Sequence, residues 1–259
     1  FSMIRATGDD VLLLTCPGEA GGVLAVLDGR VLRLSDRPAT GLWIWPEWLA
    51  FAYQQPHGNR VQIVRSGGAF EQRAICPRRM DLHDLKTCAD GEIYAARTEN
   101  NAVVRLAEDL SIAETWEFGG ETDSAHLNSV AVYQGRLLAS VFGRFDRHRQ
   151  YKEGTSGLGE VIDVRSRETF IAGLSQPHSL TVEGDRLYLC SSEERTVKVF
   201  GGEELLQEIA LPGYTRGLAL TPETLYVGLS ASRNVEENAR SGGALAAVDR
   251  ASLAVRDLT

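Results

Sequence analysis

The sequence lacks the features that would place it in several common classes of protein. It has no apolar run near the roughly 20 residues that a membrane-spanning helix needs. Its four cysteines form no CxxC pair and no dense framework, so reduced thiols in a cytoplasmic protein are the simplest interpretation. No GxSxG elbow, Walker loop or HExxH motif occurs. No signal peptide is visible, and Phe1 and Ser2 before Met3 are expected to be a cloning remnant.

Positive charge is also scarce. The 259 residues carry 27 Lys and Arg against 35 Asp and Glu, which gives a formal net charge of -8. This balance argues against a general surface for nucleic acid or for an anionic membrane, because both attract basic proteins. No stretch longer than a turn or two shows convincing helical periodicity, so we expect an all-β fold.

What the chain does contain is one strand-turn-strand unit, repeated several times. Its clearest copy opens on a Pro-His pair and continues as two short apolar strands, 179–182 and 187–190, around a Glu-Gly-Asp turn. Matching the apolar positions of the other copies puts five residues in register, at spacings of roughly 38 to 50 residues: Leu42, Leu85, Val130, Leu180 and Leu218. A period in this range, built from strands, indicates a β-propeller with one four-stranded sheet per repeat.

The repeats predict a single domain over residues 1–259, a six-bladed β-propeller of four-stranded antiparallel blades. The expected blades cover about residues 3–36, 37–79, 80–123, 124–175, 176–213 and 214–259. The count depends on a weak first inner strand, and the sequence does not reveal how the ring closes. Two long insertions, 143–159 in blade four and 230–243 in blade six, separate the second strand from the third.

The inner strand of each blade lines the central channel, so equivalent residues at the strand starts should form a ring at one mouth. Two positions before each aligned apolar residue, the sequence has Thr40, His83, Asn128, His178 and Arg216. His126 lies two residues before Asn128, and strand alternation sends it to the same face. Three of the five histidines are therefore expected at one channel mouth.

One interpretation of this ring is a metal site. Neutral imidazoles of His83, His126 and His178, with the amide oxygen of Asn128 nearby, could hold a divalent ion with an open coordination position, zinc or iron rather than calcium. Arg216 could then bind a carboxylate or phosphate of the substrate. The alternative is a wet channel in which these side chains only hydrogen-bond water and backbone. The sequence leaves both interpretations open.

The blade-four insertion is basic and aromatic, and it should overhang the same mouth. It carries Arg144, Arg147 and Tyr151, and as a lid it would favour an anionic ligand or an acidic peptide. As a mobile, solvated loop, it would do nothing specific. Asp84, next to His83, should point toward the packing between blades, either to orient an imidazole or as a turn residue.

Three segments resemble an uncharacterised family of bacterial propeller proteins, a conserved domain of unknown function. They are HLNSVAV at 126–132, GLSQPHS at 173–179 and LPGYTRGLA at 211–219. The likeness is good in the C-terminal half and poor in the first two blades, and it implies a propeller without implying an activity. More remotely, the layout is similar to the six-bladed gluconolactonase and strictosidine-synthase-like group, which places a metal or a reactive centre at the channel mouth. The acidic and amide calcium ligands of gluconolactonase are not reproduced here.

Together these observations predict a cytoplasmic, metal-dependent hydrolase or lyase that acts on an anionic small molecule or modified peptide at the channel mouth. The expected substrate-binding residues are Thr40, Arg144, Arg147, Tyr151 and Arg216. The alternative function is a non-catalytic scaffold for ligands or proteins, for example one that serves a biosynthetic partner enzyme. A bound metal with an open position would favour the enzyme, whereas a flat, exposed apolar patch would favour the scaffold.

Overall fold

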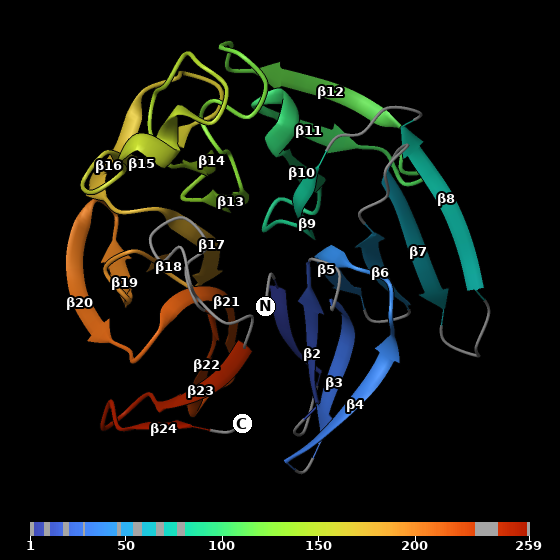
Figure 1. Cartoon of the computed structure of the whole chain (residues 1–259), viewed down its shortest axis with the longest axis vertical. Coiled ribbons are helices and arrows are strands. Elements are labelled where there is room, and N and C mark those ends of the chain that lie inside the picture. Colours follow the sequence, from blue (N-terminus) through green and yellow to red (C-terminus); the bar gives the residue numbers. More distant parts are fainter. Residues whose placement is uncertain are drawn as a thin grey trace.

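In the part of the chain that the structure describes, all regular elements other than two short 3-10 helices are β-strands. The computed structural model describes residues 3–7, 11–17, 21–27, 29–45, 48–53, 59–65, 70–76, 81–230 and 243–257. Their strands form six four-stranded antiparallel sheets, which follow one another along the chain (Figure 1). Within each sheet, neighbouring strands are also consecutive in sequence, so every pairing is of the hairpin type. The prediction of an all-β propeller with four-stranded antiparallel blades is confirmed.

The strands of the first three sheets are β1 (Met3–Thr7), β2 (Val11–Cys16), β3 (Gly22–Leu27), β4 (Arg30–Ser35), β5 (Ala39–Trp45), β6 (Trp48–Tyr53), β7 (Asn59–Arg65), β8 (Phe70–Cys76), β9 (Leu82–Thr87), β10 (Ile93–Arg97), β11 (Ala102–Leu106) and β12 (Ile112–Glu117). Those of the last three are β13 (Ser129–Tyr133), β14 (Arg136–Val141), β15 (Gly159–Asp163), β16 (Thr169–Leu174), β17 (Pro177–Glu183), β18 (Arg186–Ser191), β19 (Thr196–Gly201), β20 (Glu204–Ala210), β21 (Tyr214–Leu220), β22 (Thr224–Ser230), β23 (Gly243–Asp249) and β24 (Val255–Asp257). The 3-10 helices are η1 (Thr98–Asn100) and η2 (Gln150–Glu153). Among the described residues, no helix has the length and apolar character to cross a membrane.

The sheets surround a common centre, with the first strand of each sheet innermost (Figure 1). Inner strands of neighbouring sheets contact one another, as β5 does with β9 and β13 with β17. The weak first strand of the sequence is present, because β1 pairs with β2 along its whole length. β1 also contacts β21, so the first sheet meets the last without a strand borrowed from elsewhere.

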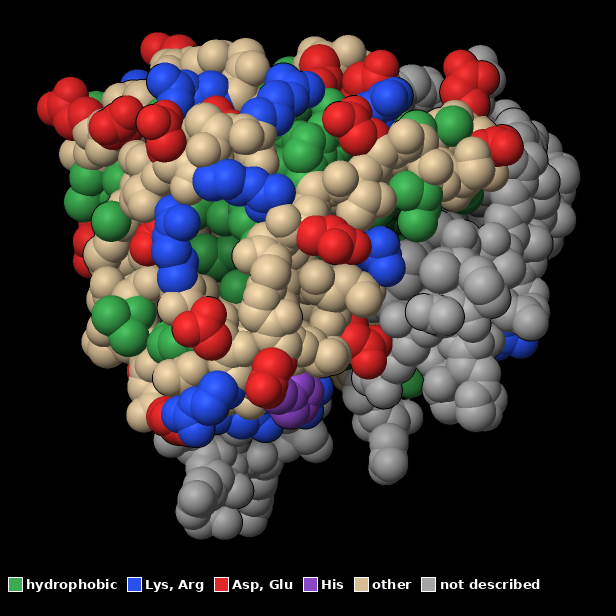
Figure 2. All heavy atoms as spheres, turned by 90° about the horizontal axis from the view of Figure 1, so that it is seen from above, with side chains coloured by type: hydrophobic (Ala, Val, Ile, Leu, Met, Phe, Trp, Pro, Cys, Tyr) green, Lys and Arg blue, Asp and Glu red, His purple; other side chains and the backbone are tan. Residues whose placement is uncertain are grey.

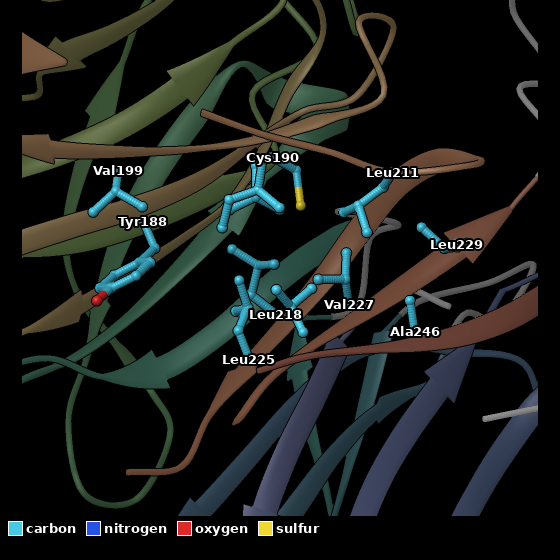
Figure 3. Packing of buried hydrophobic residues seen from close by; sticks show 12 residues of the cluster. Tyr188, Cys190, Val199, Leu211, Leu218, Leu225, Val227, Leu229 and Ala246 are labelled. Carbon is cyan, nitrogen blue, oxygen red and sulfur yellow. The ribbon is translucent and has the colours of Figure 1, made fainter. Parts of the chain in front are cut away.

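Apolar side chains at alternate strand positions fill the space between neighbouring sheets. Between the fifth and sixth sheets, Tyr188, Cys190 and Val199 meet Leu218 and Val227 (Figure 3). Burying a side chain of this size contributes about 1.5–3 kcal/mol relative to leaving it exposed. A comparable cluster lies at each of the other junctions, including that of the first sheet with the last. The inner strands are therefore held on a rigid frame.

Bulges interrupt the inner strands where the sequence places its ring of polar residues. The pairing register shifts at Thr40 in β5, at His83 in β9, just after His178 in β17 and at Arg216 in β21. A bulge inserts one extra residue, bends the strand and turns the side chains around it. Strict alternation of faces does not hold at these positions, so the bulges decide where each side chain points.

The outer surface mixes charges of both signs. On the side of the ring seen in Figure 2, acidic and basic side chains lie interspersed, with apolar side chains visible between them. The outer strand β4 exposes Val31, Leu32 and Leu34, each about half exposed. Apolar edge strands of this kind can pair with other chains, and the basic Arg30 and Arg33 of β4 oppose such pairing with a second copy of the same strand.

Candidate functional site

The structure brings His83, His126 and His178 together at one end of the ring. The ring centroids of His83 and His126 are 5.2 Å apart, and those of His126 and His178 are 6.5 Å apart. Phe142 and Tyr151 pack on the His126 ring, with centroid distances of 4.3 and 4.6 Å. We call the three histidines, with Tyr151, Tyr214 and Arg216, the histidine mouth.

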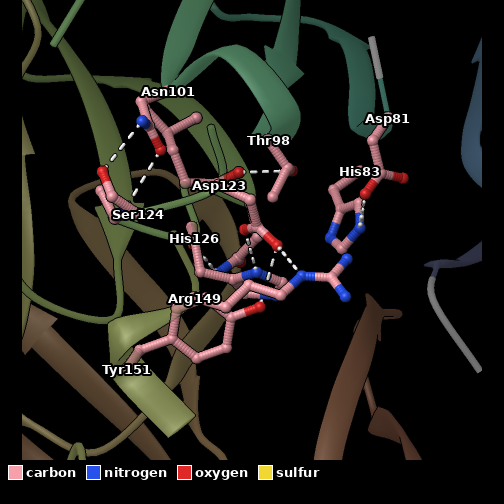
Figure 4. A network of polar contacts seen from close by, with 12 residues as sticks. Asp81, His83, Thr98, Asn101, Asp123, Ser124, His126, Arg149 and Tyr151 are labelled. Carbon is pink, nitrogen blue, oxygen red and sulfur yellow. Dashed lines mark hydrogen bonds and ion pairs between the residues drawn. The ribbon is translucent and has the colours of Figure 1, made fainter. Parts of the chain in front are cut away.

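His126 is held by a carboxylate that takes two further donors. Asp123 Oδ1 lies 2.8 Å from His126 Nδ1, while Arg149 Nε and Tyr151 Oη donate to Asp123 Oδ2 over 2.7 and 2.9 Å (Figure 4). Burial by itself would raise the pKa of Asp123, but the hydrogen bonds from these three side chains outweigh it and the pKa is lowered. The carboxylate is thus charged at neutral pH, and it accepts the Nδ1 proton of His126.

The tautomer of His126 follows from this contact. Burial lowers the pKa of His126, although Asp123 opposes the effect, so the imidazole is neutral at neutral pH. A neutral ring with its proton on Nδ1 keeps a lone pair on Nε2. His126 therefore offers a basic nitrogen whose orientation is fixed by the carboxylate behind it.

His178 has the same tautomer for a different reason. Its Nδ1 lies 2.9 Å from the carbonyl oxygen of Gln176 and 2.7 Å from Ser192 Oγ. Because a carbonyl oxygen only accepts, Nδ1 carries the proton and Nε2 the lone pair. Nε2 is buried and has no hydrogen-bond partner in the described part of the chain. An unpaired buried acceptor costs about 1–3 kcal/mol, so it calls for a ligand or a water.

Arg216 and Tyr214 border His178 on the side of the sixth sheet. The Tyr214 ring centroid lies 5.9 Å from that of His178 and 5.0 Å from the Arg216 guanidinium carbon. Burial raises the pKa of Tyr214 to about 12, so its hydroxyl stays protonated and donates to Gln176 Oε1. Burial, and next the charge of Arg216, hold the pKa of His178 well below its ordinary value. Within the residues that the structure describes, the Arg216 side chain has no ion pair.

Sequence reasoning missed the residues that orient the histidines. Asp81 Oδ2 lies 3.3 Å from His83 Nε2, so each histidine has a polar partner shortly before it in the chain. These partners, Asp81, Asp123 and Gln176, adopt left-handed φ angles of 47°, 53° and 54°. Such strained backbone gathers at functional sites. The recurring spacings Asp-x-His, Asp-x-x-His and Gln-x-His are the signal that would have found them.

Asn128 and Thr40 make hydrogen bonds between strands, and their predicted roles in metal and substrate binding stay predictions. The Asn128 amide nitrogen donates to the His126 carbonyl oxygen, and its Oδ1 accepts from Ser140 Oγ. That oxygen keeps a second lone pair. Thr40 is buried, and its hydroxyl donates to the carbonyl oxygen of Leu82 in the next sheet.

The blade-four insertion divides between the mouth and the surface. Tyr151 is buried against the histidines, and Arg149 reaches Asp123. Arg144 and Arg147 are exposed and pair with glutamates at 3.1 and 3.0 Å, and their role in substrate binding stays a prediction. The blade-six insertion falls almost entirely on residues 231–242, which lie outside the described residues.

Asp84 lies between blades, as the sequence predicts, but it orients no imidazole. Its Oδ2 accepts from Ser129 Oγ at 2.7 Å and from Val130 N at 3.1 Å, and it pairs with Lys86 Nζ at 2.9 Å. Lys86 Nζ also donates to the Leu180 carbonyl oxygen over 2.7 Å. This buried network joins the third, fourth and fifth sheets, the sheets that carry the histidines.

The described residues contain no group of three or more His, Cys, Asp and Glu arranged to hold a metal ion. His83 Nε2 faces Asp81, and the His83 and His126 rings meet edge to face at 90°. Nδ1 of His83, Nε2 of His126 and Nε2 of His178 are the ring nitrogens opposite these contacts, and each keeps a lone pair. The metal site stays a prediction.

Several solved structures share the fold. A putative oxidoreductase (glucose dehydrogenase) from Thermus thermophilus is similar with a TM-score of 0.66 at 16% identity, over 94% of this chain and 94% of that one. The PQQ-bound aldose sugar dehydrogenase of Streptomyces coelicolor has a TM-score of 0.63 at 14% identity, over 93% and 90%. Virginiamycin B lyase from Staphylococcus aureus has a TM-score of 0.60 at 11% identity, over 98% and 82%. At these identities the likeness supports the propeller fold alone.

Comparison with protein families is more specific. No curated protein matches the sequence significantly. The family described as "Domain of unknown function (DUF4915)" matches residues 69–256, most of the chain. The matched stretch contains the three histidines, their polar partners and Arg216, together with the segments whose resemblance the sequence indicated. The chain therefore belongs to the DUF4915 family.

Proposed function

We propose that this chain is a propeller enzyme, a hydrolase or lyase, that acts on an anionic small molecule or modified peptide at the histidine mouth. The observation that carries the proposal is that Nδ1 of His126 lies 2.8 Å from Asp123 Oδ1 and Nδ1 of His178 lies 2.9 Å from the Gln176 carbonyl oxygen, contacts that favour the proton on Nδ1 and the lone pair on Nε2. Two oriented, neutral and largely buried imidazoles suit general acid–base catalysis. The proposal takes the six sheets as the six blades of one closed ring, which gives the histidines a common mouth.

Each residue of the mouth then has a defined task. His126 takes a proton from the substrate or from an attacking water at Nε2, and returns it to the leaving group. Asp123 stabilises the imidazolium that forms in between, as a carboxylate behind a histidine does in other enzymes. Arg216 holds the anionic group of the substrate. Tyr151 and Phe142, packed on the His126 ring, hold the imidazole in its orientation.

One protein of the same fold lends the proposal support. A histidine-to-alanine variant of virginiamycin B lyase from Staphylococcus aureus, with quinupristin, is described as catalytically inactive. That protein needs a histidine on a propeller for its activity. In this chain we assign the catalytic histidine to His126, because Asp123 orients its ring.

A divalent metal, zinc or iron in preference to calcium, is a second way to use the same nitrogens. Nε2 of His126 and Nε2 of His178 are donors of the kind that both ions accept. A metal held there would polarise a carbonyl or activate water. A catalytic zinc site usually has three protein ligands, and His83 would supply the third through Nδ1 while Asp81 holds its Nε2.

The proposal is tested by turnover and by metal content in the same preparations. Protein purified without a metal-affinity step is assayed on a panel of lactones, carboxylic esters, phosphoesters and hydroxy acids. We expect the wild type to convert at least one class and the His126→Ala/His178→Ala double variant to convert none. Near-stoichiometric zinc or iron in the wild type, lost in the double variant, would support the metal. Equal turnover by both proteins would refute the enzyme site.

A non-catalytic scaffold is the second candidate, favoured by the outer strand β4. Val31, Leu32 and Leu34 expose apolar surface there, which is the feature expected of a surface that binds another protein. A biosynthetic partner enzyme would dock on this edge while the mouth holds a ligand. Failure of the whole panel, together with loss of partner capture after Leu32→Lys and Leu34→Lys, would favour the scaffold.

A further inference from the structure

His178 and Arg216 leave their polar capacity unused in the same part of the mouth. The His178 side chain is nearly enclosed, with the residue 6% exposed, and its Nε2 has no hydrogen-bond partner among the described residues. Arg216 is half-buried beside it, with the Tyr214 ring next to both side chains. A buried acceptor and a cation without a counter-ion are each unfavourable alone. Both groups lie beside the Tyr214 ring, so they offer two polar contacts to one small ligand.

Nε2 of His178 needs a hydrogen-bond donor from the ligand. Nδ1 of His178 is committed to the Gln176 carbonyl oxygen, so Nε2 is an acceptor and nothing else in the neutral ring. The charge of Arg216 reaches this ring and works against its protonation. The same charge works against a cationic ligand group at Nε2, a metal ion included. A neutral O–H of the ligand meets both conditions.

The Arg216 guanidinium is best matched by a ligand group with one negative charge. Arg149, the other arginine of the network, already pairs with Asp123 at 2.7 Å, so it adds no net charge to the mouth. Among the described residues of the mouth, Arg216 is the cation left over. A carboxylate matches one planar guanidinium in charge and in bidentate geometry. A phosphate dianion would leave one charge without a partner.

We propose that the histidine mouth binds a hydroxycarboxylate, with the carboxylate on Arg216 and the hydroxyl donating to Nε2 of His178. This inference rests on the proposed function, since it names the substrate class of the same site. The ring centroids of His178 and His126 are 6.5 Å apart, so a ligand on His178 would lie beside the proposed base. Simple carboxylates without a hydroxyl should bind by the Arg216 contact alone.

Matched pairs of small acids test the proposal without any assay of turnover. Glycolate against acetate, and lactate against propionate, differ by one hydroxyl, and binding is measured by calorimetry and by the rise in melting temperature. We expect each hydroxy acid to bind roughly threefold to tenfold more tightly than its partner, as one net hydrogen bond gives. A shift of the His178 Nε2 resonance on adding glycolate, absent with acetate, would locate the bond. Inorganic phosphate should bind more weakly than glycolate.

Variants separate the two contacts. Arg216→Gln should weaken all four acids at least tenfold, whereas Arg186→Gln, at an exposed arginine at the far end of the same kind of hairpin, should change none. His178→Phe should erase the preference for the hydroxyl and leave acetate binding in place. If His178→Phe does not fold, the wild-type resonance shift decides. Equal binding of glycolate and acetate, or tighter binding of phosphate, would overturn the proposal.

The outcome is distinguishable from that of the proposed function. Hydroxy acids that bind with the expected preference, in a protein that converts nothing, would keep the binding site and remove the enzyme. Turnover that depends on His126, without any preference for the hydroxyl, would support the enzyme and refute the hydroxycarboxylate site.

Discussion

Replacing Asp123 with asparagine should lower kcat/KM by about 10²–10⁴-fold on any substrate that the wild type converts, which is the range of general acid–base catalysis. The carboxylate accepts from His126, Arg149 and Tyr151 at once. An amide offers one oxygen in place of two, and its NH₂ group cannot accept the Nδ1 proton of His126. The imidazole is then free to carry its proton on Nε2, where the base is needed. The measurement is steady-state kinetics over a range of pH.

A matched substitution controls for the loss of a buried carboxylate. Asp163 is also buried, and its Oδ1 accepts from the backbone nitrogens of Arg165 and Ser166 at the end of β15, far from the mouth. Asp163→Asn should leave kcat/KM within a few-fold. Since Asp123 acts through His126, its variant should also change the shape of the pH profile, which a purely structural effect would not do. An unchanged rate and profile in a folded Asp123→Asn variant would refute the assigned base.

Replacing Asp84 with alanine should lower the free energy of unfolding by about 3–5 kcal/mol, the cost of breaking a buried ion pair by removing one partner. The change would leave Lys86 nearly buried without its carboxylate, and the Ser129 hydroxyl and Val130 N–H without their acceptor. Because the network joins three sheets, the substitution should also weaken the contacts of β9 with β13 and β17. Urea unfolding followed by circular dichroism measures it.

Two further variants separate charge from contact at this network. Pairing Asp84→Ala with Lys86→Met removes both charges, so the double variant should be more stable than Asp84→Ala alone. Asp109→Ala removes an exposed turn carboxylate that binds Ser111, and it should cost less than about 1 kcal/mol. A double variant that is no better than Asp84→Ala would mean that the unpaired charge is not what destabilises the protein.

Much of the fold was readable in the sequence, because a propeller repeats one hairpin. The apolar positions Leu85, Val130, Leu180 and Leu218 recur at similar spacing, and all of them are buried in the structure. Burial on alternate positions is what a pleated strand requires, so short apolar runs around Gly and Asp turns specified the strands. The same register predicted that the histidines lie close together, and the rings of His83 and His178 both lie within 6.5 Å of that of His126.

Side-chain detail at the mouth was beyond this reasoning. The bulges at His83 and Arg216 break the alternation that the prediction used, and no local pattern marks them. His126 lies before β13 with a left-handed φ of 47°, so it reaches the group through its contact with Asp123 and not through strand alternation. Arg149 and Arg144 differ because the fold brings Asp123 to the first and Glu160 to the second.

The central claim is that His126 and His178 are neutral, with the proton on Nδ1 and the lone pair on Nε2. The direct measurement is the ¹⁵N spectrum of the histidine side chains as the pH falls from about 8 to about 5, across the ordinary histidine pKa of about 6.5. Since burial lowers the pKa of both residues, their Nδ1–H tautomers should persist below pH 6.5. Protonation of both rings near pH 6.5, or a proton on Nε2, would contradict the account.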